Sequence, residues 1–346
     1  MKILFLYTEI ASYFTACVDE LSKETEVHVL RYPINKEAPF QFSTGTKIIY
    51  YERNDYTYDK LRKLIEKINP DAIFCSGWID KDYLKICKFY KNKIPTVLCM
   101  DTKWKGNFKQ IFASILAPFI ITNKFSHAWV PGNIQQEFAL RLGIKKENIR
   151  QGYYCADTNF FINCYNNNKE QKNKKFPKRL IYVGRYYEFK GITDLWTAFV
   201  ELQIESPNEW ELWCLGTGDL KPIEHPKIKH IGFVQTADLT GYIENTGVFV
   251  LPSRFEPWAV VVHEFAAAGF PLLLSSEVGA KELFLEENVN GHQFEANNIE
   301  DLKENLKKFF TYSDERLNLM SKHSNELSRQ LTIDKWCNIA REIIKQ

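Results

Sequence analysis

Short apolar runs alternate with amphipathic stretches through the first half of the chain. Helical spacing follows the first run, through Val18 and Leu21, and recurs around residues 61–68. Apolar runs bounded by polar residues indicate strands at 2–7, 27–30, 47–51, 72–75, 96–100 and 127–130. Continuous apolar strands that alternate with amphipathic helices indicate a parallel sheet covered on both faces.

The second half repeats this alternation after an abrupt change in composition. Residues 163–178 are rich in Asn and Lys, which favours a solvated linker. Strands are predicted at 180–183, 210–215, 228–233, 248–251 and 271–275, and a last helix begins near Thr332. We expect two Rossmann-like α/β domains, at 1–162 and 179–330, whose parallel sheets face a central cleft. Residues 331–346 form a C-terminal helix, and packing back on the N-terminal domain is one arrangement for it.

Composition supports a globular protein of two domains. The 346 residues exceed what one ordinary core needs, and 45% hydrophobic with 25% charged residues is typical of soluble proteins. The formal net charge is +2, from 45 basic and 43 acidic residues. This balance indicates no preference for polyanions, so no nucleic-acid partner is expected.

The cysteines and the lengths of the apolar segments indicate the cellular compartment of the protein. Eight cysteines are scattered without a C-x-x-C pair, and several lie inside apolar runs. This is typical of reduced cysteine in the cytosol, used as a small hydrophobe. The apolar part of residues 1–10 is short for a secretory signal, and the longest apolar stretch, 111–122, falls short of the ~20 residues that span a bilayer. We expect a cytoplasmic protein.

Ligands of open parallel sheets lie beyond the carboxyl ends of the strands, so the chemistry is sought there. Gly184-Arg185 follows the strand at 180–183, and Lys190-Gly191 precedes a helix. Two cations beside a helix N-terminus suit a phosphate group. A pair of surface cations on a tight turn is the equal alternative for this short motif.

Gly216-Thr217-Gly218 follows the strand at 210–215. Glycines at this place allow backbone angles closed to other residues and the close approach of a ligand. The third glycine of a dinucleotide fingerprint does not follow, which disfavours an NAD site.

The strongest motif runs from Pro252 to Pro271, across a strand end, a loop and a helix. Glu256 lies in the loop, where it can reach sugar hydroxyls, and Glu264 lies roughly 12 Å further along the helix. Backbone N–H groups around residues 258–260 would face a diphosphate between them. Glu264 stands among apolar residues, and a buried carboxylate needs a partner, so a merely solvated Glu264 is disfavoured.

Together these motifs resemble the retaining glycosyltransferases of family four, which have the two-domain GT-B fold. Segments 127–132 and 152–157 are similar to a bacterial surface-polysaccharide branch of that family. The motifs that carry the resemblance are Gly184-Arg185, Lys190-Gly191, Gly216-x-Gly218, Pro252 to Pro271 with Glu256 and Glu264, Gly279-Ala280-x-Glu282-Leu283 and Asn290-Gly291.

The resemblance implies a role for each matching residue. Arg185 and Lys190 would hold the diphosphate of a nucleotide-sugar and stabilise its charge as the glycosidic bond breaks. Glu264 would accept hydrogen bonds from the ribose, and Glu256 would bind the hydroxyls of the donor sugar. No metal and no cofactor is implied, because cations and a helix terminus take the metal's place. The remaining implied binding residues are Gly184, Gly216, Gly218, Phe233, Val234, Trp258, Ala259 and Val260.

Two positions depart from the family pattern. Family members usually have Gly where this chain has Ala259, and a methyl group there narrows the approach of a ligand to the backbone. Many relatives have a histidine near the reacting sugar at the place where this chain has Asp101. An aspartate there would orient the sugar or stabilise positive charge on it. The alternative is an aspartate that caps a helix or lies in a loop.

Residues 103–124 place eight large apolar side chains at roughly helical spacing, among Lys103, Lys105, Lys109 and Lys124. A helix packed into its own domain is the commoner outcome of such a pattern. The alternative is docking on an anionic membrane, at the inner face, that holds a lipid-linked acceptor.

We therefore expect transfer of a sugar, with retention, from a nucleotide-diphosphate sugar to a glycan or lipid-linked acceptor in surface polysaccharide synthesis. A nucleotide-sugar epimerase would need acid and base groups in the cleft, and few histidines qualify. A non-catalytic scaffold that binds nucleotide-sugar is the other alternative, supported by Asp101 and Ala259.

Overall fold

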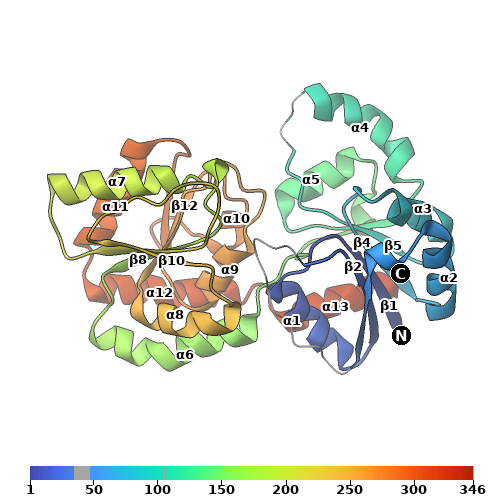
Figure 1. Ribbon diagram of the computed structural model, residues 1–346, viewed down its shortest axis with the longest axis horizontal. Helices are drawn as coiled ribbons and strands as arrows, with labels where there is room; N and C mark the ends of the chain where they lie inside the picture. Colours follow the sequence, from blue (N-terminus) through green and yellow to red (C-terminus); the bar gives the residue numbers. More distant parts are fainter. Residues whose placement is uncertain (35–46, 105, 107, 346) are drawn as a thin grey trace. The chain divides into compact units, whose positions relative to one another are not determined.

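The computed structural model describes residues 1–34, 47–104, 106 and 108–345. These residues form two compact units, one made of Met1–Cys155 with Leu331–Gln346 and the other of Ala156–Gln330 (Figure 1). Each unit is an α/β domain built on one parallel sheet. Lys105 and residues 35–46 lie outside the described residues.

The first unit alternates strands and helices as its hydrophobic pattern predicts. In chain order its elements are β1 (Lys2–Tyr7), α1 (Ser12–Ser22), β2 (Glu26–Arg31), β3 (Ile48–Glu52), α2 (Tyr58–Ile68), β4 (Ala72–Ser76), α3 (Lys81–Tyr90), β5 (Thr96–Cys99), α4 (Phe108–Ile121), β6 (His127–Trp129), α5 (Asn133–Arg141), β7 (Ile149–Arg150) and α13 (Ile333–Ile344).

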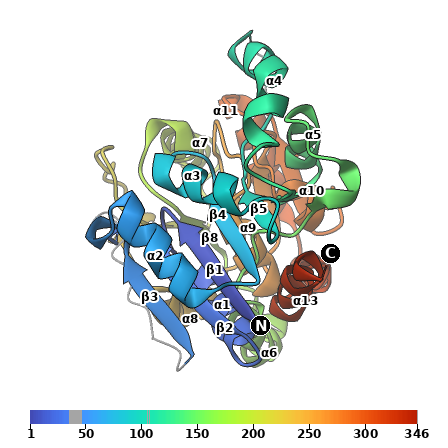
Figure 2. The ribbon, with the colours of Figure 1, turned by 90° about the vertical axis from the view of Figure 1, so that its right-hand side faces the viewer.

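The first sheet has the strand order β3-β2-β1-β4-β5-β6-β7, with every described pair parallel. Phe5 of β1 lies beside Val29 of β2 and Phe74 of β4. Because side chains alternate along a strand, Phe5 points to one face of the sheet and its neighbours Leu4 and Leu6 to the other. Helices α1 and α13 cover the first face, and α2 and α3 cover the second (Figure 2).

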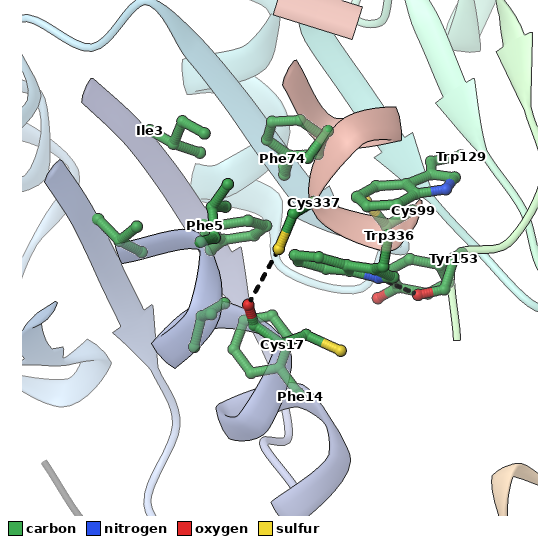
Figure 3. Close-up of a cluster of buried hydrophobic side chains, with 14 of the residues drawn as sticks. Ile3, Phe5, Phe14, Cys17, Phe74, Cys99, Trp129, Tyr153, Trp336 and Cys337 are labelled. Atoms are coloured by element: carbon green, nitrogen blue, oxygen red, sulfur yellow. Dashed lines mark hydrogen bonds between the residues drawn. The ribbon is translucent and has the colours of Figure 1, made fainter. Parts of the chain in front are cut away.

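The last helix of the chain completes the core of the first unit. Trp336 of α13 is 1% exposed, its ring centroid lies 4.7 Å from that of Trp129, and its Nε1–H donates to the carbonyl of Tyr153 at 2.7 Å (Figure 3). The thiol of Cys337 donates to the carbonyl of Cys17 at 3.7 Å. Residues 331–346 thus belong to the same compact unit as the first strand of the chain.

The second unit holds the other parallel sheet, with the strand order β10-β9-β8-β11-β12-β13. The chain builds β8, β9 and β10 outward in one direction and then returns to place β11, β12 and β13 on the other side of β8. The elements are α6 (Thr158–Lys174), β8 (Arg179–Val183), α7 (Ile192–Glu205), β9 (Glu211–Leu215), β10 (Ile228–Gly232), α8 (Thr240–Asn245), β11 (Val248–Leu251), α9 (Val260–Ala267), β12 (Leu272–Ser275), α10 (Lys281–Phe284), β13 (Gly291–Phe294), α11 (Ile299–Thr311) and α12 (Asp314–Ser328).

The predicted linker at 163–178 is wrong, because most of it lies in helix α6, inside the second unit. The carboxylate of Asp157 caps the helix by accepting from the N–H of Phe160. A narrow stripe through Phe161, Cys164 and Lys172 is buried, while Asn and Lys residues occupy the solvent side. The polar composition of a mostly exposed helix therefore hid its single buried stripe, and the units divide between residues 155 and 156.

Two edge strands were missing from the predicted pattern. β7 contains only two residues, and the sequence of β13, Gly-His-Gln-Phe, lacks the continuous apolar run of the central strands. Strands at the edge of a sheet need less apolar surface than central strands, which pack on both sides.

We expect Trp336→Ala to destabilise the first unit by about 3–5 kcal/mol, because it removes a large buried side chain and leaves the carbonyl of Tyr153 without its donor. Urea unfolding followed by tryptophan fluorescence and circular dichroism measures the change. Lys335→Ala, on the exposed side of the same helix, is the control and should change stability by less than ~0.5 kcal/mol. Equal stabilities of the two variants would mean that α13 is not part of the core in solution.

Candidate active site

The predicted site residues of the second unit follow four neighbouring strands. Residues 184–190 follow β8, 216–218 follow β9, 233–234 follow β10, and 252–260 follow β11. Because the sheet is parallel, these segments meet at its carboxyl edge. The order of strands reverses between β8 and β11, and the carboxyl ends at such a reversal form a ready-made binding crevice.

The loops after β8 and β11 are joined by their backbones. Gly191 has a φ of +64°, and a Cβ on it would lie 2.1 Å from the carbonyl oxygen of Pro252. The N–H groups of Arg254 and Phe255 both donate to the carbonyl of Phe189, at 2.9 and 3.2 Å. Glycine is therefore required at 191 both by conformation and by space.

This junction brings together two residues to which the motif gives different roles. The ammonium of Lys190 lies 2.5 Å from Oε2 of Glu256, and the hydroxyl of Ser253 donates to the same oxygen at 3.2 Å. Glu256 is 9% exposed, so its charge is balanced by a neighbour rather than by bulk water. The pair forms across a sequence separation of 66 residues.

Arg254 holds the same junction from the other side and was missed by the sequence reasoning. Its guanidinium donates to both carboxylate oxygens of Asp194, at 2.6 and 2.9 Å, and also pairs with Glu188. Hydrogen bonding to Asp194 raises the pKa of Arg254 further above its usual value. Asp194 stands in the first turn of α7, and no local pattern links it to a residue 60 positions away.

The predicted glycines after β9 pack against the first loop. A Cβ on Gly216 would lie 1.9 Å from the carbonyl oxygen of Gly184, and a Cβ on Gly218 would lie 2.5 Å from that of Tyr186. Gly216 also donates its N–H to the carbonyl of Gly232, which ends β10 and precedes Phe233 and Val234. Both glycines thus permit backbone contact between neighbouring loops. The sequence motif predicts only that they allow unusual backbone angles and let a ligand approach closely.

The helix after β11 begins at a strained residue. Ala259 has φ +82° and ψ +88°, a conformation that costs a residue with a Cβ roughly 1–2 kcal/mol. Its methyl group cannot cap the helix, so the first N–H groups of α9, which starts at Val260, keep their capacity to bind an anion. Trp258 is only 2% exposed, so what it can offer a ligand is its backbone rather than its ring.

Glu264 lies in α9 and is partly buried. Burial raises the pKa of its carboxyl to about 7, and the charge of nearby Asp157 adds to the shift. Its neighbour His263 is fixed by both ring nitrogens, because Nδ1 accepts from the N–H of Ala156 at 3.1 Å and Nε2 donates to the carbonyl of Ser328 at 3.0 Å. His263 therefore holds the helix in place through two backbone contacts, and the Glu264 carboxyl has a pKa near neutral pH.

The remaining predicted residues are Arg185 and Asp101. Arg185 is partly buried directly after β8, and its carbonyl accepts from the hydroxyl of Tyr182 at 2.8 Å. Asp101 lies in the first unit, between β5 and α4, and accepts from the hydroxyl of Tyr154 at 3.3 Å. Asp101 precedes α4 by too many residues to cap it, and its role at a reacting sugar stays a prediction.

Among the described residues, no group of three or more His, Cys, Asp or Glu side chains is arranged to hold a metal ion.

Comparisons with known proteins agree with this arrangement. Residues 177–311, which include all four loops, match the model of the family "Glycosyl transferases group 1". An uncharacterized glycosyltransferase of Haemophilus influenzae is 27% identical over 201 residues, which cover 53% of this chain and 55% of that protein. One of Methanocaldococcus jannaschii is 33% identical over 124 residues, 33% of this chain and 31% of that protein. The chain thus spans about half the length of the first relative and a third of the second.

A solved structure covers the whole chain. The crystal structure of HepE from Anabaena, in complex with UDP and glucose, superposes with a TM-score of 0.73 at 15% identity and covers 100% of both chains. At this identity the likeness shows the fold. The two parallel-sheet domains, of seven and six strands, therefore have the GT-B fold, as the sequence resemblance predicted.

We expect Ala259→Gly to stabilise the second unit by about 0.5–1 kcal/mol, because glycine adopts this conformation without strain and loses part of the gain to its flexible unfolded state. Thermal and urea unfolding measure the change. Ala237→Gly is the matched control, because Ala237 is exposed in a short helical turn, and should cost about 0.5–1 kcal/mol. The same loss in both variants would show that position 259 is not strained in solution.

Proposed function

We propose that this chain is a glycosyltransferase that takes a sugar from a nucleoside-diphosphate sugar and passes it, with retention and without a metal ion, to a glycan or lipid-linked acceptor. The observation that carries the proposal is the Lys190–Glu256 pair, which joins the segment after β8 to the loop that leads into α9, where the strand order reverses. The match of residues 177–311 to the group 1 glycosyl transferases supports it. Retention, and a place in surface polysaccharide synthesis, rest on the resemblance of the motifs.

Donor binding would exchange the partners of the Lys190–Glu256 ion pair. A diphosphate at the N-terminus of α9 would compete with Glu256 for the ammonium of Lys190, which lies 2.5 Å from that carboxylate. Once Lys190 turns to phosphate, Glu256 has acceptor capacity for hydroxyls of the donor sugar. After this exchange Lys190 binds the diphosphate and Glu256 binds the sugar. The buried Glu256 carboxylate therefore has a partner both before and after the donor binds.

Catalysis in this proposal is stabilisation of the leaving group. The bond between the anomeric carbon and the diphosphate oxygen breaks, and its electron pair stays on the phosphate. Arg185, Lys190 and the N–H groups of α9 bind this added charge more strongly than they bind the intact donor, which accelerates the step. The acceptor oxygen bonds to the anomeric carbon on the same face, and its proton passes to the leaving phosphate.

UDP is the first nucleoside diphosphate to test, because HepE, which shares the fold, was solved with UDP and glucose. We assign the ribose hydroxyls to Glu264, the base to the segment of Phe233 and Val234, and Asp101 to the sugar. These assignments follow the motif positions.

We expect UDP-glucose, or the matching sugar conjugate of another base, to raise the melting temperature, with an affinity that increases with pH. The ionised carboxylate of Glu264 accepts from the ribose, and its pKa is about 7. The affinity should therefore rise about tenfold between about pH 6 and pH 8. Both donor phosphates stay ionised in this range. Glu264→Gln should bind more weakly and without this pH dependence, by isothermal titration calorimetry.

The raised pKa of Glu264 also predicts how the stability of the donor-free protein changes with pH. A carboxyl whose pKa is raised by folding destabilises the native state progressively as pH rises from about 4.5 to about 7. At about pH 8, Glu264→Gln should thus be more stable than the natural chain, by on the order of 1–3 kcal/mol.

If the affinity of Glu264→Gln for the donor depends on pH as steeply as that of the natural chain, Glu264 is not part of the donor site. No binding of any nucleoside diphosphate or its sugar conjugates would overturn the proposed function.

We expect Arg185→Ala to lower turnover at saturating donor by about 10²–10³-fold, because a charge aimed at the leaving group is lost. Its free energy of unfolding should change by less than ~0.5 kcal/mol, since the side chain is only partly buried. Release of the nucleoside diphosphate measures turnover. Lys221→Ala, an exposed cation in the same unit, should leave turnover unchanged. Equal fractional losses of stability and turnover in Arg185→Ala would contradict the assignment.

A further inference from the structure

Helix α4 of the first unit presents its apolar side outward. The helix has 14 residues, and Figures 1 and 2 show it at the margin of the first unit, away from the strands. The exposed fraction reaches 91% for Phe108, 71% for Phe112 and 77% for Phe119. The large apolar side chains exposed along this helix are Phe108, Ile111, Phe112, Ile115, Leu116, Phe119 and Ile120.

The spacing of these residues shows that the exposure is a continuous stripe. Each of them has another member of the set three or four positions away, and together they cover about half of the circumference of the helix. Ala117 and Ile121 lie on the opposite side and join a core cluster of the first unit. Among the described side chains of the helix, Ala117 and Ile121 therefore anchor α4, and the seven large apolar side chains stay 44–91% exposed.

The charged residues of the segment that contains this stripe have one sign. From residue 102 to residue 136 the chain contains Lys103, Lys105, Lys109 and Lys124 and no Asp or Glu. Lys124 follows the helix, and its pKa is lowered by burial and by the charge of Lys88, which places a further cation at that end. In the sequence, the stripe is therefore flanked by lysines, without a carboxylate in its own segment to neutralise them.

We propose that α4 docks the protein on an anionic lipid surface, with the apolar stripe at the boundary between headgroups and acyl chains and the lysines at the headgroups. Apolar residues on one side and cations at the border are the pattern of an interfacial helix. Fourteen residues reach roughly 21 Å, too short to cross the apolar layer. No helix of the described residues is long and apolar enough to span a bilayer.

The charge pattern favours lipid over a second copy of the chain. In a two-fold dimer through α4, the lysines of this segment would approach the same lysines of the other copy, because the same surface is used twice. Like charges brought together at an interface oppose its formation. An anionic surface instead gains from each lysine that approaches it.

This docking deepens the proposed function, and in that respect rests on it, because it would hold the enzyme where a lipid-linked acceptor lies. Lipid binding itself does not depend on sugar transfer. The two proposals can therefore fail separately, and the experiment includes a donor-binding measurement for that reason.

The test is co-sedimentation of the full chain with vesicles of phosphatidylcholine alone and of phosphatidylcholine with about one third phosphatidylglycerol. The double variant Phe112→Ser/Phe119→Ser removes two exposed rings that support no core. Ile204→Ser is the matched control, because Ile204 is 75% exposed on α7 of the second unit. Donor binding by all three proteins and light scattering of the free proteins accompany the measurement.

We expect the natural chain and Ile204→Ser to bind the anionic vesicles, with binding that weakens as salt is raised. The double variant should bind at least about tenfold more weakly while its donor binding stays unchanged. Equal binding by the double variant, or no binding of the natural chain to anionic vesicles, would overturn the proposal. A natural chain that is dimeric, with a monomeric double variant, would overturn it in favour of a second copy.

Discussion

The candidate site depends on the close crossing of two loops at Gly191 and Pro252. A side chain at 191 would collide with the carbonyl of Pro252, so glycine permits the crossing. The crossing lets Arg254 reach Asp194 and Lys190 reach Glu256. Both contacts connect the segment between β8 and the first turn of α7 to the loop after β11, so they hold two ion pairs near the reversal of strand order.

The same region holds three features that are energetically costly, and a bound anion would offset one of them, the uncapped N-terminus of α9. Ala259 adopts a left-handed conformation, and Glu264 is buried enough to hold its proton up to about pH 7. The first N–H groups of α9 have no capping side chain at Ala259. Each feature costs free energy in the unliganded protein, and each lies along the segment between Trp258 and Glu264. Concentration of strain and raised pKa in one segment is typical of a binding site.

The first unit distributes its apolar residues in two ways. Trp336 and Phe5 lie inside, where the C-terminal helix closes the core. On α4, by contrast, the large apolar side chains lie outside, and the small Ala117 faces the domain. Both helices have apolar residues at helical spacing. Whether the large apolar side chains of such a helix are buried or exposed therefore depends on which side of the helix its own domain occupies.

Hydrophobic periodicity and the position of motifs after strands are local properties. The sequence alone therefore determined the two parallel sheets, the place of the second unit's predicted site residues after the strands, and the family resemblance. Contacts between distant residues leave no local pattern. Only the tertiary structure decided the Lys190–Glu256 pair and the role of Arg254. It also decided that residues 163–174 belong to a helix, because the few apolar residues of this segment indicate a buried side only when the surface that they pack against is known. For α4, periodicity predicted one apolar side, and the packing of the whole unit decided that this side faces outward.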